Sequence, residues 1–200
     1  MIEQLLGPDI YLLTDQMFLK PPFQGSPKEW HQDSGSWTHL VPPSQVTCWI
    51  ALDDATIPNG CLRYLRGSHK LGLLAEPQLQ RLVEEDAPAN EVPVEVPAGG
   101  AVLHHSLAVH SSGPNETPQR RRGWGLHYMA SDTRDLRPPT LVTVEPIHIR
   151  GGANPRLEAA GTSIKDALFA YPGKKHAREA PGLWGDAEVG LLIGNRTDGF

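Results

Sequence analysis

His31 and Asp33 form the first pair of side chains whose types and spacing could do chemistry together. On an extended strand, residues i and i+2 point to the same face, so this pair could offer one imidazole nitrogen and one carboxylate oxygen to a single metal ion. Gln32, between them, would be turned aside. His-x-Asp arises easily by chance in a chain with 9 histidines. A polar pair on a surface loop is therefore the simpler explanation of this motif alone.

His110 is the candidate for a third ligand, because it ends an apolar stretch and is followed by the turn residues Gly113-Pro114-Asn115. Arg120-Arg121-Arg122 come after the turn and lead into an alternating stretch. We expect a hairpin that returns one arginine to the side of His110 and leaves the other two solvated, since a strand alternates its faces. A buried guanidinium near a metal needs an anion, and a dicarboxylate can supply one through a bidentate pair. His104 and His105 are rival ligands, but neither is followed by a turn and an arginine.

Two histidines and one carboxylate on one face of an octahedral ion are the ligands of non-haem iron(II) oxygenases. Three segments, Trp30–Asp33, Asn59–His69 and His110–Arg121, together resemble the phytanoyl-CoA dioxygenase (PhyH) family in their order and spacing. The resemblance covers roughly residues 17 to 130. It implies a mainly β fold, the double-stranded β-helix (a jelly roll, or cupin-like fold) with few peripheral helices. It also implies iron(II), 2-oxoglutarate as co-substrate and O2.

The resemblance assigns roles to residues of this sequence. The metal ligands it implies are His31, Asp33 and His110. The co-substrate residues it implies are Arg121 for the distal carboxylate, Ser112 as an assisting hydroxyl, and the neighbours Gln32 and Trp49. Three more residues could contact the substrate, or in the case of Lys20 the co-substrate: Lys20, Trp37 and His39. An exposed lysine and a core or rim position are equally plausible explanations of these three.

The elements that must position these residues are mostly short strands, because Gly 20 and Pro 19 make the chain rich in turns. The strands predicted from alternation and turn residues are Gln45–Leu52, Cys61–Leu65, Pro93–Val96, Ala101–Leu103, Leu107–His110, Gly123–Met129 and Leu141–Glu145. The predicted helices are Pro77–Glu85 and Ser163–Ala170. Residues 1–150 are expected to form the jelly-roll oxygenase core. Residues 151–200 are expected to form a C-terminal appendage packed on it.

Only 30 residues precede His31, fewer than family members usually carry there, so the core is expected to have a shortened N-terminal region. The net charge of −5 argues against a nucleic-acid or membrane-binding surface. Two cysteines cannot build a disulfide framework or a four-thiolate zinc site. No signal peptide or apolar span of membrane length is visible. We therefore expect a cytoplasmic protein with a small-molecule substrate, and the sequence does not indicate its oligomeric state.

The expected activity is that of an iron(II)- and 2-oxoglutarate-dependent dioxygenase that hydroxylates an unactivated C–H bond and releases succinate and CO2. The carboxylate of Asp33 favours hydroxylation over halogenation, because halogenases of this type leave that coordination position to a halide. Two alternatives remain open: a non-catalytic jelly-roll binding protein derived from the same family, and a cupin-like metal enzyme without 2-oxoglutarate. The arginine after His110 argues against the second, because such an enzyme needs no dicarboxylate anchor.

Overall fold

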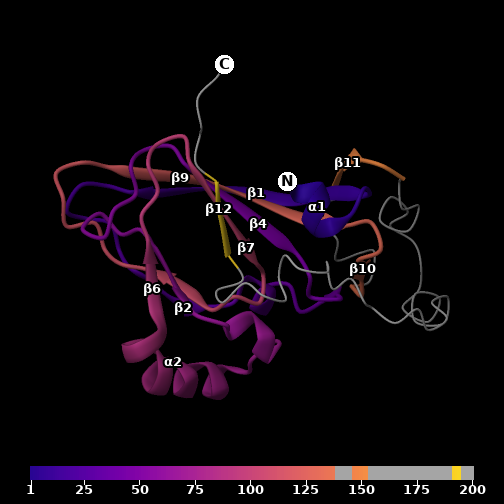
Figure 1. Ribbon diagram of the computed structural model, residues 1–200, viewed down its shortest axis with the longest axis horizontal. Coiled ribbons are helices and arrows are strands. Elements are labelled where there is room, and N and C mark those ends of the chain that lie inside the picture. Colours follow the sequence, from indigo (N-terminus) through magenta and orange to yellow (C-terminus); the bar gives the residue numbers. More distant parts are fainter. Residues whose placement is uncertain (138–145, 153–190, 195–200) are drawn as a thin grey trace.

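A computed structural model describes residues 1–137 and 146–152 and the backbone of residues 191–194. Strands dominate, as predicted, and most belong to two sheets that face each other as a double-stranded β-helix (Figure 1). The large sheet has the strand order β11 (Ile147–Arg150), β1 (Ile10–Lys20), β9 (Arg121–Ala130), β4 (Val46–Ala51), β7 (Ala101–His105), β12 (Leu191–Gly194). The small sheet has the order β2 (Lys28–His31), β8 (His110–Ser112), β5 (Leu62–Leu65), β6 (Glu91–Val94).

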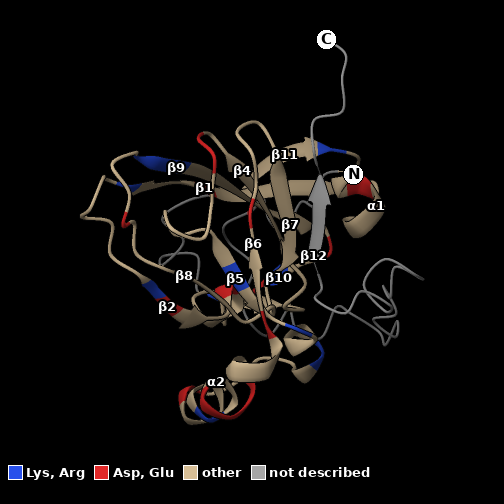
Figure 2. Cartoon of the chain, turned by 60° about the vertical axis from the view of Figure 1, so that its left-hand side comes forward, with Lys and Arg blue, Asp and Glu red and all other residues tan. Residues whose placement is uncertain are grey.

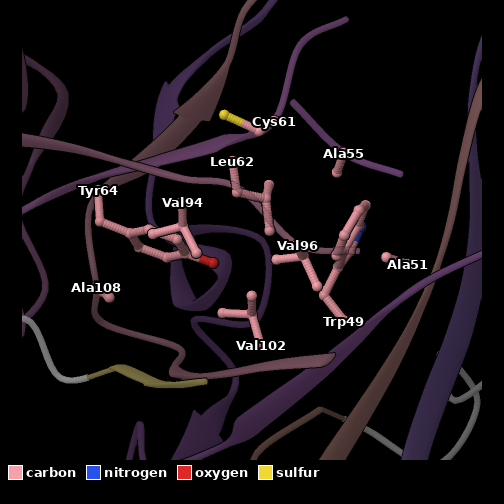
Figure 3. Close-up of a cluster of buried hydrophobic side chains, with 10 residues drawn as sticks. All are labelled: Trp49, Ala51, Ala55, Cys61, Leu62, Tyr64, Val94, Val96, Val102 and Ala108. Atoms are coloured by element: carbon pink, nitrogen blue, oxygen red, sulfur yellow. The ribbon is translucent and has the colours of Figure 1, made fainter. Parts of the chain in front are cut away.

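A buried apolar cluster fills the space between the sheets (Figure 3). Trp49 from β4 and Val102 from β7 contribute from the large sheet, and Tyr64 from β5 and Val94 from β6 from the small one. These side chains alternate with outward-facing ones along their strands, so each strand presents a single apolar face to the core. The polar site lies beside this core.

Helices cover the outside. The short α1 (Ile2–Leu6) packs on the outer face of the large sheet. The longer α2 (Glu76–Asn90) lies below the small sheet in Figure 1, where Leu79 packs against Leu65 and Val109. The predicted helix Pro77–Glu85 is confirmed, but the observed helix continues to Asn90. The prediction stopped short of Pro88 because proline usually ends a helix, whereas Pro88 lies inside α2. None of the helices in this part of the chain has the length and apolar composition of a membrane span.

Several smaller elements complete the fold. A two-stranded sheet pairs β3 (Leu40–Val41) with β10 (Arg134–Asp135). Two 3-10 helices, η1 (Asp33–Gly35) and η2 (Ser68–Leu71), follow β2 and β5. The described part of the C-terminal region, β12, pairs antiparallel with β7 at the edge of the large sheet.

The expected hairpin between His110 and the arginines is wrong. His110 begins β8 in the small sheet, whereas Arg121 begins β9 in the large sheet, so the intervening turn carries the chain across from one sheet to the other. His110 also begins its strand rather than ending one, because Leu107–Val109 lie in the preceding turn. The predicted strand Leu141–Glu145 and helix Ser163–Ala170 lie outside the described residues.

Candidate metal and co-substrate site

Three side chains converge where β2 and β8 meet. His31 at the end of β2 lies directly opposite His110 at the start of β8, and their ring centroids are 4.2 Å apart. Asp33 Oδ1 lies 3.7 Å from Nε2 of each histidine, and the three candidate ligand atoms all lie within 4.8 Å of one another. Nitrogen and oxygen ligands bind such ions at about 2 Å, so adjacent ligand atoms would be roughly 3 Å apart. The three atoms therefore fit one shared cation after a small contraction.

Asp33 is not on the strand, as the alternation argument assumed. It begins the 3-10 helix η1, and Gln32 before it is still extended, with φ −113° and ψ 133°. The extended geometry at Gln32 is sufficient to return Asp33 to the face of His31. Its buried carboxylate stays ionised: burial raises its pKa, but the adjacent His110 and the hydrogen bond with His104 lower the pKa well below the usual range.

Both candidate histidines present Nε2 to the shared point. His31 Nδ1 lies 2.8 Å from the Glu29 carbonyl oxygen and His110 Nδ1 lies 2.9 Å from that of Ala108. A carbonyl oxygen only accepts, so Nδ1 carries the proton and Nε2 has a free lone pair, the form that binds metals. Burial lowers the pKa of His110 to about 3 and also lowers that of His31, which keeps both rings neutral near pH 7.

The convergent groups open onto a cavity of about 640 Å³ between the two sheets. It is lined by His31, Asp33 and His110 together with the predicted residues Lys20, Trp37, Trp49, Ser112 and Arg121. The structure thus brings eight of the ten sequence-predicted site residues to one place.

Arg121 is the buried cation of this cavity. It is only 2% exposed, and one of its terminal nitrogens donates to the Gly60 carbonyl oxygen. Its guanidinium carbon lies 5.4 Å from the centroid of the Trp49 ring, and Nε has no hydrogen-bond partner within residues 1–137, 146–152 and 191–194. No carboxylate of the described residues forms an ion pair with it, and burial lowers its pKa to about 10. An uncompensated guanidinium in a cavity fits the carboxylate of a bound acid.

The neighbouring arginines face away from the cavity, as alternation along β9 requires. Arg120 has a side chain that is 64% exposed. Arg122 forms a two-pronged pair with Asp53, in which Nε and Nη2 each donate at 2.8 Å to a different carboxylate oxygen.

Lys20 lies in the same cavity and is 7% exposed. It is the direct cross-strand partner of Arg121 in the β1–β9 pair. Burial, and then the charge of Arg121, lower its pKa to about 8. Its ammonium group donates to the Ser26 carbonyl oxygen and has no carboxylate partner among the described residues.

Two predicted site residues are not in the cavity lining. The amide of Gln32 bonds the carbonyl oxygens of Leu107 (2.7 Å) and Gly72 (2.8 Å), and its oxygen accepts from the Leu74 backbone N–H (2.8 Å). Gln32 therefore links loops behind the site, and the structure does not bring it together with the other predicted co-substrate residues. His39 likewise lies apart from the other predicted site residues. It precedes β3, and its pKa is lowered by burial and by Arg137, away from the cavity.

Three further polar residues contact the site: Thr47 and His127, to which no role was assigned from the sequence, and His104, which was considered only as a rival ligand. Thr47 donates to Asp33 Oδ2 at 2.8 Å, and His104 Nε2 lies 3.1 Å from the same oxygen. His127 Nδ1 lies 2.9 Å from the Thr47 hydroxyl oxygen and, like Thr47 and His104, borders the cavity. Alternation could have found Thr47, because it shares a strand face with Trp49.

Comparison with known proteins agrees with this geometry. The family described as Phytanoyl-CoA dioxygenase (PhyH) matches residues 2–123. Phytanoyl-CoA dioxygenase 1 from Oryza sativa subsp. japonica is 31% identical over 128 residues, 60% of this chain and 45% of the rice protein. The L-proline trans-4-hydroxylase of Streptomyces griseoviridis is 31% identical over 170 residues, 70% of this chain and 63% of that protein. The chain thus spans about half the length of the curated relatives it matches.

Solved structures point the same way. The non-heme monooxygenase ThoJ in its nickel complex superposes with a TM-score of 0.62 at 30% identity, covering 78% of this chain and 57% of ThoJ. EctD from S. alaskensis, with 2-oxoglutarate and 5-hydroxyectoine, gives 0.53 at 27% identity, covering 64% of this chain and 46% of EctD. Fold, convergent ligands and sequence match agree, and the chain belongs to the phytanoyl-CoA dioxygenase (PhyH) family of iron(II)- and 2-oxoglutarate-dependent oxygenases.

Proposed function

We propose that this protein is an iron(II)- and 2-oxoglutarate-dependent dioxygenase that hydroxylates an unactivated C–H bond of a small organic molecule, releasing succinate and CO2. One observation carries the proposal. A single cavity holds a two-histidine, one-carboxylate cluster and, beside it, a buried guanidinium that no carboxylate in the described part of the chain pairs with. A metal site alone does not need the second feature.

His31, Asp33 and His110 would hold the metal. When bound, iron(II) with 2-oxoglutarate supplies the oxidation of a C–H bond by O2, and the protein supplies position and exclusion of water. The three side chains would supply one face of an octahedral site and would leave three positions for exchangeable ligands. The neutral histidines and the ionised Asp33 are already in the protonation states that ligation needs.

Arg121 would anchor the distal carboxylate of 2-oxoglutarate, because its fork matches a carboxylate and it is held against Trp49. Lys20, opposite Arg121, would add a second positive charge, and Ser112 would add a hydroxyl. Ser112 is 5% exposed and borders the same cavity. A dianion is the ligand that compensates two adjacent buried cations.

The charge of the cavity favours substrates that carry a negative charge. Lys20, Lys28 and Arg121 line it, and Asp33 is the one carboxylate that the described residues contribute to the lining. Iron(II) and 2-oxoglutarate bring equal and opposite charges, so the cavity would remain positive when both are bound. In Figure 2 the basic starts of β9 and β2 lie on the same side of the molecule. The preference would be tested by comparing succinate release with small acids and with their neutral amides.

The two alternatives use fewer of these features. A non-catalytic binding protein has no physical need for the full set of ligands and Arg121 together. A metal enzyme without 2-oxoglutarate has no need for a buried, unpaired Arg121. Neither explains Lys20 lying opposite Arg121 in a cavity that contains three metal-ligand side chains.

The deciding experiment is anaerobic titration of the whole chain with iron(II) and then 2-oxoglutarate, following the weak visible charge-transfer band of the chelate. The unaltered protein and a His105→Gln control, which changes the histidine after His104, should both develop the band. His110→Gln should not. A band in His110→Gln, or no band in the unaltered protein, would refute the proposal.

A further inference from the structure

The second oxygen of Asp33 ends two buried hydrogen-bond chains. One runs from His127 through the Thr47 hydroxyl, with steps of 2.9 and 2.8 Å. The other runs from the Tyr64 hydroxyl through His104, with steps of 2.9 and 3.1 Å. All four supporting side chains are at most 3% exposed. Oδ1 is left facing His31 and His110.

Hydrogen-bonding capacity fixes the direction of the first chain. An ionised carboxylate only accepts, so the one hydroxyl proton of Thr47 must point to Asp33. The Thr47 oxygen can then only accept from His127, whose proton must lie on Nδ1. Any other arrangement would place two acceptors 2.8 or 2.9 Å apart without a proton between them.

The second chain has a fixed direction for the same reason. His104 must donate from Nε2 to Asp33, and in a neutral ring Nδ1 is then the acceptor. Among the described residues, the group at Nδ1 is the fully buried Tyr64 hydroxyl, 2.9 Å away, which can donate its proton to that nitrogen. Tyr64 therefore selects the ring form of His104 that can donate to Asp33.

Strand register places these groups beneath Asp33. His104 on β7 and His127 on β9 are the direct cross-strand partners of Thr47 on the central strand β4. The three side chains form a polar row across the inner face of the large sheet. Asp33 belongs to η1, which follows β2 of the small sheet, and its carboxylate bonds to this polar row. The two hydrogen-bond chains therefore link the candidate metal site to the large sheet.

We propose that Thr47 and His104 are positioning residues that occupy Asp33 Oδ2 and so restrict Asp33 to binding the metal through Oδ1 alone, with His127 and Tyr64 fixing their donor directions. This inference rests on the proposed metal site. A carboxylate that bound through both oxygens would take one more position on the ion. Two histidines and a single oxygen leave three positions of an octahedron for exchangeable ligands.

The test compares matched variants of the whole chain in the absence of 2-oxoglutarate. Thr47→Val removes the hydroxyl at nearly constant shape, and Thr47→Ser keeps it. Ser34→Ala is the control, because the Ser34 hydroxyl is also buried and bonded, to Ser106 Oγ at 2.8 Å, one residue from Asp33 but not to its carboxylate. Cobalt(II) affinity is measured by calorimetry, the cobalt(II) visible spectrum reports coordination, and thermal unfolding reports stability.

Thr47→Val should bind cobalt(II) roughly 10- to 100-fold more weakly, the usual effect of removing a partner of a metal ligand, and should change the spectrum. Thr47→Ser should restore both. Ser34→Ala should lose stability but keep affinity and spectrum. Tyr64→Phe keeps the ring that stacks on His110 and removes only the hydroxyl that bonds His104, so it should weaken binding several-fold. It covers the case in which Thr47→Val does not fold.

Three results would overturn the inference: an unchanged affinity in Thr47→Val or, if that variant does not fold, in Tyr64→Phe; no rescue by Thr47→Ser; or an equal loss in Ser34→Ala. Tight cobalt(II) binding by the unaltered protein together with any of these results refutes only the positioning role. Absence of binding by the unaltered protein refutes the proposed metal site as well, so the two failures are distinguishable.

Discussion

Lys20 on β1 and Arg121 on β9 lie directly opposite each other in an antiparallel pair, and both are almost fully buried. Like charges in directly opposite positions destabilise a sheet, and burial increases their repulsion. No carboxylate of the described residues pairs with either. The strands therefore hold two cations whose repulsion a bound dianion would relieve, which links the stability of this sheet to occupancy of the cavity.

Lys20 should make stability depend on pH. Its pKa is lowered from 10.5 to about 8 in the folded protein. Between these values the unfolded chain binds more protons at this position, so the free energy of unfolding without co-substrate should rise from pH 8 towards pH 10. Affinity for 2-oxoglutarate should fall over the same range as the charge is lost. Urea unfolding and calorimetry at pH 7.5 and 9.5 measure both.

Lys20→Gln is the informative variant for this prediction. It should be more stable than the unaltered protein at pH 7.5, should bind 2-oxoglutarate more weakly, and should lose both pH effects. Lys28→Gln, which removes an exposed lysine from the same cavity, is the control and should retain them. A pH-dependent rise that persists in Lys20→Gln would assign the effect to another group.

Arg121→Lys should weaken 2-oxoglutarate binding, because an ammonium group cannot reproduce the two parallel hydrogen bonds of a guanidinium. A hydrogen bond to a charged group contributes about 1.5–3 kcal/mol, so the loss should be roughly 10- to 100-fold. Iron(II) or cobalt(II) affinity should stay nearly constant. Arg120→Lys is the matched control, since its side chain is 64% exposed. Equal losses of 2-oxoglutarate affinity in the two variants would show that the orientation of Arg121 into the cavity is not the cause of the loss.

Much of the site could be predicted because its signals are local. His31 and Asp33 are separated by one residue, and Arg121 differs from its neighbours by strand alternation, which the structure follows. The supposed hairpin was wrong because turn residues such as Gly113-Pro114 look alike whether the chain returns to the same sheet or crosses to another. That choice depends on pairing with strands far away in sequence.

Strand β1 could not be predicted from alternation, because its register shifts between Leu12 and Thr14 and this irregularity interrupts the period of two. The polar row that bonds Asp33 could not be predicted from the sequence for a different reason. Thr47, His104 and His127 come from three strands and meet only through long-range register. A single sequence contains the alternation of each strand but not the alignment between them.

Gly123→Ala should disturb the co-substrate site by displacing the Trp49 ring. A Cβ at Gly123 would lie 2.0 Å from Cζ2 of Trp49, so the indole ring that lies 5.4 Å from Arg121 must move. Overpacking of this kind costs about 1–3 kcal/mol of stability. Loss of a desolvated cation–π contact of up to about 2 kcal/mol should weaken 2-oxoglutarate binding roughly 10-fold.

Gly35→Ala is the control for this substitution, because nothing lies within 4 Å of the added Cβ. It should leave the melting temperature and 2-oxoglutarate affinity essentially unchanged. If Gly123→Ala also left the melting temperature and the 2-oxoglutarate affinity unchanged, Trp49 would not be needed to support Arg121.

Removal of residues 191–200 should loosen the metal site through the sheet. This deletion takes away β12 and leaves the outer edge of β7 unpaired, at the strand where Leu191 lies opposite His104. Loss of the backbone hydrogen bonds along this register, at about 0.5–1.5 kcal/mol each, gives an expected loss of roughly 1–3 kcal/mol. For a chain of this size the melting temperature should fall by about 3–10 °C. Because His104 holds Asp33, cobalt(II) affinity should fall as well. Deletion of residues 195–200 alone keeps β12 and is the control, and equal effects of the two deletions would show that β12 does not support β7.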